Sequence, residues 1–137
     1  MPKRLFSTAA ICALAALCAR AETYYYDTIQ YKLSDVENIS IQTTTVEVNG
    51  ETQYLWYTLD SEGNRVNCTA FPWFTEQDSI VFLHSDNGVG TNNKKIYLDT
   101  DINVASVDYY MSYTTLVSSN GSTLTTTGDF NMNYSSN

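Results

Sequence analysis

Residues 99 to 103, Asp-Thr-Asp-Ile-Asn, place oxygen-bearing side chains at alternate positions. Calcium-binding loops use this spacing, because carboxylate and amide oxygens are the ligands of a hard cation. Such loops also need a glycine at the sixth position and a bidentate glutamate at the end, and here Val104 stands sixth. We therefore interpret the segment as a turn between strands and predict no metal site in it.

Other residues capable of catalysis or metal binding are few. His84 is the single histidine, and Ser85-Asp86 beside it is ordinary loop composition that supplies no nucleophile. A glycosidase needs two carboxylates about 5 to 10 Å apart across a cleft, and nothing in the sequence pairs them. Zinc needs several closely spaced Cys or His ligands, whereas the chain offers Cys68 and His84 beyond its N-terminal segment. We predict neither an enzymatic activity nor a cofactor.

Aromatic side chains are the strongest candidates for binding, because a flat ring with a polar edge stacks on sugars. They are dense in the N-terminal half of the chain: Tyr24, Tyr25, Tyr26, Tyr54, Trp56, Tyr57 and Trp73. Aromatic residues on strands more often fill a core or pair across strands. A glycan-binding surface built from Trp56, Tyr54, Tyr57 and Trp73 is therefore the alternative hypothesis.

The N-terminal segment, positions 1–21, has the features of a secretory signal peptide. Lys3 and Arg4 precede an apolar run from Leu5 to about Cys18, and Ala19-Arg20-Ala21 gives the small-x-small pattern of a cleavage site. The run is shorter than the about 20 residues of a transmembrane helix. We expect cleavage after Ala21, secretion to the extracellular space or cell surface, and no stable membrane insertion.

Removal of this segment leaves an acidic domain. Four basic residues then face fifteen acidic ones, a net charge of −11. Phosphate backbones and anionic membranes attract clusters of Lys and Arg, so neither is an expected partner. Cys68 is the single remaining cysteine, which excludes an internal disulfide framework.

The mature chain is rich in Thr, Tyr and other β-branched or aromatic residues, and no amphipathic helix is visible after the signal. These features predict an all-β protein. Asn49-Gly50 lies between two strand-like runs and indicates a hairpin, because both positions tolerate positive φ. Asp60 to Asn64 forms the next predicted turn, and Pro72 marks a junction. Residues 22–77 are expected to form an antiparallel β-meander.

From residue 78 onward the strands become short and evenly spaced. The expected strands are DSIVFLHSD, KKIYLD, INVASVDY, TTLVSS, STLTTT and DFNMNY. Placing residues 96–98 over 115–117, and Ile102 with Val104 over Leu124 with Thr126, gives offsets near twenty residues. That offset corresponds to one coil of a parallel β-helix, whose apolar positions stack into interior columns. Leu98, Val104, Leu116 and Leu124 are the residues expected in such a column.

Residues 78–137 resemble bacterial secreted or surface β-helix proteins with autotransporter-associated β-strand repeats, of the autotransporter and PEP-CTERM kinds. The matching segments are Asp78 to Phe82, Leu98-Asp99-Thr100-Asp101 with Val104, and Gly121 to Thr125. The Gly/Trp-rich opening and the Asn-Trp motif of that family are missing. Its members continue for many coils, so the resemblance implies either a truncated reading frame or a small free-standing product.

The sequence thus predicts a signal peptide (1–21), an antiparallel β cap (22–77) and the first coils of a right-handed parallel β-helix (78–137). The expected function is that of a secreted or cell-surface structural or adhesive passenger module without catalysis. A small carbohydrate-binding β-sandwich is the alternative. Unpaired strand edges at the C-terminal coil predict self-association, and extracellular glycans are the other expected partner.

Overall fold

The computed structural model describes residues 21–27, 38–83, 94–110 and 114–132. In these ranges the protein is all-β, as predicted, and has no helix. Consequently, no apolar helix of membrane-spanning length occurs in them. The predicted signal segment up to residue 20, His84 and the loop around it lie outside the described residues.

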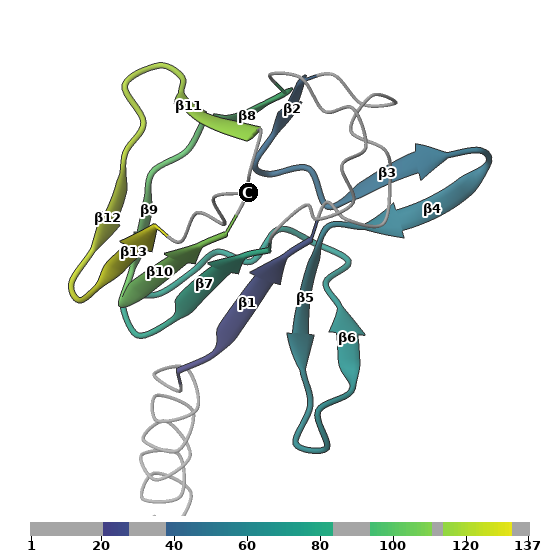
Figure 1. Ribbon diagram of the computed structural model, residues 1–137, viewed down its shortest axis with the longest axis horizontal. Helices are drawn as coiled ribbons and strands as arrows, with labels where there is room; N and C mark the ends of the chain where they lie inside the picture. Colours follow the sequence, from purple (N-terminus) through teal and green to yellow (C-terminus); the bar gives the residue numbers. More distant parts are fainter. Residues whose placement is uncertain (1–20, 28–37, 84–93, 111–113, 133–137) are drawn as a thin grey trace, which may run out of the picture.

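Short strands make up the described ranges. Their bounds are β1 (Thr23–Tyr26), β2 (Asn38–Ser40), β3 (Thr45–Val48), β4 (Glu51–Tyr54), β5 (Trp56–Leu59), β6 (Arg65–Asn67), β7 (Ser79–Phe82), β8 (Lys94–Leu98), β9 (Ile102–Val104), β10 (Ser106–Tyr109), β11 (Thr114–Ser118), β12 (Leu124–Thr126) and β13 (Phe130–Met132). They form a six-stranded sheet in the order β13-β10-β7-β1-β5-β6, a three-stranded sheet β11-β8-β2, and the pairs β12-β9 and β3-β4. Figure 1 shows β1, β7, β10 and β13 side by side, with β8 and β11 above them.

Parallel pairing joins strands that are far apart in the sequence. β1, β7, β10 and β13 form one parallel row, while β2, β8 and β11 form a second and β9 with β12 a third. In the first row, Tyr24, Ile80, Val107 and Phe130 occupy one register position. Side chains at one register position face the same side of a sheet, so such a row stacks like residues.

One of the two predicted registers is confirmed and the other is off by one residue. Leu124 pairs with Ile102, and Thr126 with Val104, as predicted. Ile96, however, pairs with Leu116 and not with Thr115. A one-residue slip would have turned Leu116 to the opposite face; in the observed register it is half-buried and packs against the core.

The two predicted turns of the N-terminal region are confirmed. Asn49 and Gly50 have φ values of 53° and 78° and connect β3 to β4, which pair antiparallel. Asp60 closes the β5–β6 turn by accepting hydrogen bonds from the amides of Glu62 and Asn64 at 2.9 and 2.8 Å. The amide hydrogen bond from Asn64, followed by that from Glu62, lowers the pKa of the Asp60 carboxyl below its ordinary value.

The N-terminal region is not the purely antiparallel meander that we expected. β5 pairs antiparallel with β1 and β6, but β1 and β2 pair in parallel with β7 and β8. Two predicted strands also divide, one at the buried Leu55 and one at Ala105, so that their halves belong to different sheets. A single core cluster includes Tyr26 and Trp56 from the N-terminal region together with Phe82 and Val107 from the C-terminal one.

Backbone segments approach closely at the corner that precedes β7, β10 and β13. Ala105 N donates to Asp78 O, and Gly128 N donates to Ala105 O, each at 2.7 Å. A Cβ atom on Gly128 would lie 2.8 Å from the carbonyl oxygen of Ala105. The corner therefore has no room for a larger residue at position 128.

We expect Gly128→Ala to lower the free energy of unfolding by about 1–3 kcal/mol, because the backbone must shift to admit the methyl group. Urea denaturation followed by circular dichroism measures this loss. The neighbouring Thr127→Ala exchange, at an exposed side chain, is the control and should change stability by less than about 0.5 kcal/mol. Equal stability of Gly128→Ala and the wild type would contradict the close corner contact.

Candidate functional site

Trp56, the first of the predicted sugar-binding rings, belongs to the core. Its side chain is 0% exposed, and its indole Nε1 donates to Ile41 O at 3.0 Å. The ring contacts Tyr26 at 4.7 Å and Phe74 at 5.2 Å between centroids. This corrects the expectation of a surface ring, because a ligand outside the protein has no access to Trp56.

Tyr57 faces outward, but both faces of its ring are occupied. Tyr25 stacks on one side with 5.0 Å between centroids and 11° between planes. The Arg65 guanidinium carbon lies 4.1 Å from the Tyr57 centroid. Burial raises the pKa of the Tyr57 phenol, and the Asp27 carboxylate raises it further. A sugar ring therefore has no free face of Tyr57 on which to stack.

The remaining two predicted binding residues lie in different surroundings. Tyr54 is half-buried at the end of β4. Trp73 is 72% exposed and packs edge-on against Phe71 at 5.1 Å between centroids. The four predicted rings thus comprise one core residue, one sandwiched tyrosine, one half-buried tyrosine and one exposed tryptophan. The structure does not assemble them into the flat surface that the hypothesis required.

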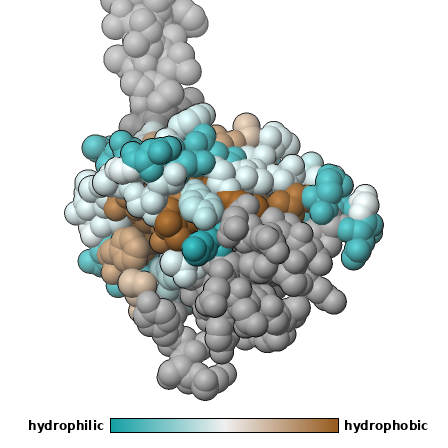
Figure 2. All heavy atoms as spheres, turned by 90° about the horizontal axis from the view of Figure 1, so that it is seen from above, coloured by the Kyte–Doolittle hydropathy of each residue, from teal (hydrophilic) through white to brown (hydrophobic). Residues whose placement is uncertain are grey.

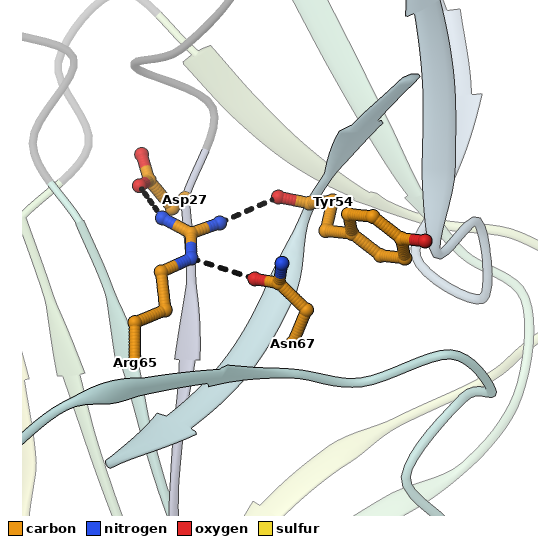
Figure 3. A network of polar contacts seen from close by, with 4 residues as sticks. All are labelled: Asp27, Tyr54, Arg65 and Asn67. Atoms are coloured by element: carbon orange, nitrogen blue, oxygen red, sulfur yellow. Dashed lines mark hydrogen bonds and ion pairs between the residues drawn. The ribbon is translucent and has the colours of Figure 1, made fainter.

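A polar network around Arg65 was not predicted from the sequence. Its guanidinium donates from Nη1 to Asp27 Oδ2 at 2.9 Å, from Nη2 to Tyr54 O at 2.9 Å and from Nε to Asn67 Oδ1 at 2.7 Å (Figure 3). The Arg65 and Asp27 side chains are 26% and 8% exposed. Because Tyr54 ends β4 and Asn67 ends β6, the network joins the β3–β4 hairpin to the large sheet. One feature of the sequence could have indicated this network, since Arg65 is the only lysine or arginine between Lys32 and Lys94.

Asp99 and Asp101, the residues considered for calcium, hold neighbouring strands together. Asp99 accepts hydrogen bonds from Ser40 Oγ, at the end of β2, and from Gln42 Nε2, in the turn that follows. Asp101 Oδ1 accepts the amide of Thr123, just before β12, at 2.9 Å. Among the described residues, no three His, Cys, Asp or Glu side chains gather as a metal site would require. The Asp99-Thr100-Asp101 turn therefore connects the segment after β2 on one side with the start of β12 on the other.

Cys68 is a half-buried free thiol that packs against the core. Burial raises the pKa of this thiol, and the charge of Glu22 adds to the effect. A raised thiol pKa lowers the thiolate fraction, which is the reactive form. The structure thus gives Cys68 the properties of a small packed residue.

The last strand of each parallel row forms what we name the terminal edge, consisting of β11, β12 and β13. Apolar side chains become more exposed toward it. Ile80 and Val107 are buried, whereas Phe130 at the same register position is 43% exposed. In the second and third rows, buried Ile96 and Ile102 are followed by Leu116 and Leu124, which are half-buried. Another layer placed on this edge would complete their burial.

Figure 2 shows a band of hydrophobic residues across one face of the described residues, with hydrophilic residues along its upper side. Leu59, Val66, Trp73, Tyr110, Phe130 and Met132 are the large apolar residues with exposed side chains in the described ranges. Two of them, Phe130 and Met132, belong to β13 of the terminal edge. The terminal edge is accordingly the best candidate for an interaction site.

The chain matches no family model, no curated protein and no solved structure. The resemblance to autotransporter-type β-helix proteins stays a prediction from residues 78–137. Function is therefore inferred from the strands, their register and their edges.

Proposed function

We propose that the described strands are successive coils of a right-handed parallel β-helix, and that the protein is a secreted or cell-surface structural or adhesive module. One coil comprises β7, β8 and β9, the next comprises β10, β11 and β12, and β13 begins a third. The supporting observation is that β7, β8, β9 and β10 each pair in parallel with the strand three places later. Right-handed connection is the rule for parallel strands in one sheet.

The sequence distance between paired strands supports the same proposal. In the first row, hydrogen-bonded side chains lie 27 residues apart between β7 and β10 and 23 residues apart between β10 and β13. The Asp101–Thr123 hydrogen bond, at the start of β9 and β12, spans 22 residues. In the second row, Leu98 pairs with Ser118 across a slightly shorter interval. Such intervals suit one coil of a β-helix, and small insertions at the corners account for the differences.

The other end of the proposed stack is capped. β5 pairs antiparallel with β1, and β6 pairs with β5, so a parallel coil cannot continue on that side of the large sheet. Trp56 on β5 covers the aromatic column of Tyr26, Phe82 and Tyr109, whose neighbouring rings lie 5.7 and 5.3 Å apart. The large sheet accordingly ends in antiparallel strands on one side, and its β13 edge can accept a further strand.

A structural or adhesive role fits these features better than catalysis. Arg65, Asp78, Asp99 and Asp101 all use their polar atoms for contacts within the chain. After residue 21 the chain carries a net charge of −11, which disfavours nucleic acids and anionic membranes as partners. The observation that carries the proposal is the in-register parallel pairing, because it builds a continuous core with outward-facing side chains on every coil.

Export is tested by fractionating cells that produce the full-length chain. We expect a product that starts at Glu22, is slightly lighter than the 15.4 kDa precursor and is found in the medium or on the cell surface. Leu14→Arg places a charge in the apolar run and should retain the precursor inside the cell. Thr23→Ser, outside the run, is the control and should leave export unchanged. An uncleaved intracellular wild-type chain would contradict the proposed localisation.

A further inference from the structure

We propose that the terminal edge binds the terminal edge of a second copy of this chain, so that the protein forms a closed two-fold dimer. This inference rests on the proposed stack and names the partner of its uncapped end. It starts from backbone groups at the edge. β12 pairs with β9 through residues 123, 125 and 127, since Ile102 N donates to Thr123 O and Thr127 N donates to Val104 O. Strand geometry then directs the amides of Leu124 and Thr126 away from β9.

The same alternation applies to β11. Ser119 N donates to Leu98 O at 2.8 Å, which places Val117 on the paired side and turns the amides of Leu116 and Ser118 outward. Within the described ranges, neither β11 nor β12 has a second neighbouring strand. Outward amides and carbonyls in a row form hydrogen bonds readily with another strand edge.

Charge distinguishes the β13 edge of the large sheet from its opposite edge, β6. Proteins protect exposed strand edges with charged side chains and proline. At the opposite edges, β6 carries Arg65, whereas β2 and β9, like β11, β12 and β13, carry neither a charged residue nor a proline. Charged residues and proline therefore protect none of the three strands of the terminal edge.

The charge distribution also selects a second copy as the partner. Residues 22–108 contain fourteen acidic and four basic residues, whereas residues 109–137 contain Asp129 as their one charged residue. Two copies of so acidic a chain repel each other over most of their surface, and the terminal edge is where they meet with least repulsion. Pairing of identical edges is isologous, and its two-fold symmetry closes the assembly at two copies.

Partly exposed apolar side chains at the terminal edge make dimer formation more favourable. Phe130, Leu116 and Leu124 end the interior columns and lose exposure when a second layer covers them. Burial of apolar surface drives association, and backbone pairing fixes the orientation. The terminal edge therefore combines uncharged strands, outward-facing backbone amides and partly exposed apolar side chains.

The test is sedimentation equilibrium of the processed product of the full-length gene across a range of concentrations. We expect a reversible monomer–dimer equilibrium without larger species. Thr126→Pro removes an outward amide and places a ring on the edge, so the dimer dissociation constant should rise at least about tenfold. Thr126→Ala loses the hydrogen bond from Thr126 Oγ1 to Gly128 O but keeps the amide, and it should dimerise like the wild type.

If circular dichroism shows that Thr126→Pro is unfolded, a second variant replaces it. Thr125→Glu adds an acidic residue at an exposed position of β12 and should weaken the dimer at low salt and restore it at high salt. A monomeric wild type overturns the proposed dimer, as does growth into open-ended polymers. If that monomer still forms the cross-coil disulfides described at the end of the Discussion, the stack stands and the dimer alone is lost.

Discussion

Trp56→Ala will lower the free energy of unfolding by about 3–5 kcal/mol, the usual cost of truncating a large buried aromatic residue. The ring is fully buried, and it meets side chains from β1, β7 and the segment after β6. Its removal leaves a cavity between β5, β1 and β7, and Ile41 O loses its indole donor. Small domains have free energies of unfolding of about 5–15 kcal/mol, so this variant should be close to unfolding. Urea denaturation followed by far-UV circular dichroism measures the loss.

Trp73→Ala is the matched control, since it removes the same side chain from an exposed position. We expect a stability change below about 1 kcal/mol. Glycan retention on an array gives a second readout, because Trp73 is the predicted sugar-binding ring that remains accessible. A folded Trp56→Ala variant with wild-type stability would show that position 56 is not in the core and would contradict the described packing of Trp56.

Arg65→Met is expected to lower the free energy of unfolding by about 2–4 kcal/mol, below the cost of breaking a fully buried ion pair because Arg65 is partly exposed. Three hydrogen bonds and the contact with the Tyr57 ring are lost together. The Asp27 carboxylate, 8% exposed, loses the cation that offsets its desolvation. Arg65→Lys should recover only part of the loss, because an ammonium group cannot reproduce the guanidinium fork.

A double-mutant cycle separates the ion pair from the rest of the network. We expect Asp27→Asn combined with Arg65→Met to be less destabilised than the sum of the single variants, by at least about 1 kcal/mol. Lys95→Met removes an exposed cation and should have little effect. Strict additivity of the two changes would contradict a direct Arg65–Asp27 interaction.

Local sequence signals predicted the turns and most strands correctly. Asn49-Gly50 specifies its hairpin through φ values that few other residue pairs tolerate, so no tertiary information was needed. Alternating apolar residues likewise located β7, β8 and β11. The error in the β8–β11 register arose because Thr115, Leu116 and Val117 are all good strand residues, and only burial of Leu116 selects among the pairings.

Long-range features could not be predicted in the same way. β1 pairs with β7, which lies far along the chain, and the sequence of neither strand indicates which strand it pairs with. Trp56 and Trp73 are identical residue types in aromatic surroundings, yet one is buried and the other exposed. Phe71 and Phe74 pack on Trp56, whereas Trp73 lies between them in the same loop and remains exposed. The Arg65 network depends on three segments meeting and was missed for the same reason.

The proposed stacking of successive coils is tested most directly by engineered disulfides across the parallel rows, with the three native cysteines replaced by alanine. Neighbouring strands lie about 4.8 Å apart, and disulfides form when Cα atoms are about 4.4–6.8 Å apart. One outward-facing pair per row is changed to cysteine in a separate variant: Ser79 with Ser106, Tyr97 with Val117, and Asn103 with Thr125. Ser79 with Asp108, two positions out of register, is the control pair.

We predict that all three in-register pairs oxidise to an intramolecular disulfide in the folded protein, seen as the loss of two hydrogens in the intact mass. The control pair should stay reduced or react only after unfolding. This result would establish that residues 79–125 wind through two stacked coils. Oxidation of the control pair with failure of the three others would contradict the register, and with it the β-helix and the function proposed for it.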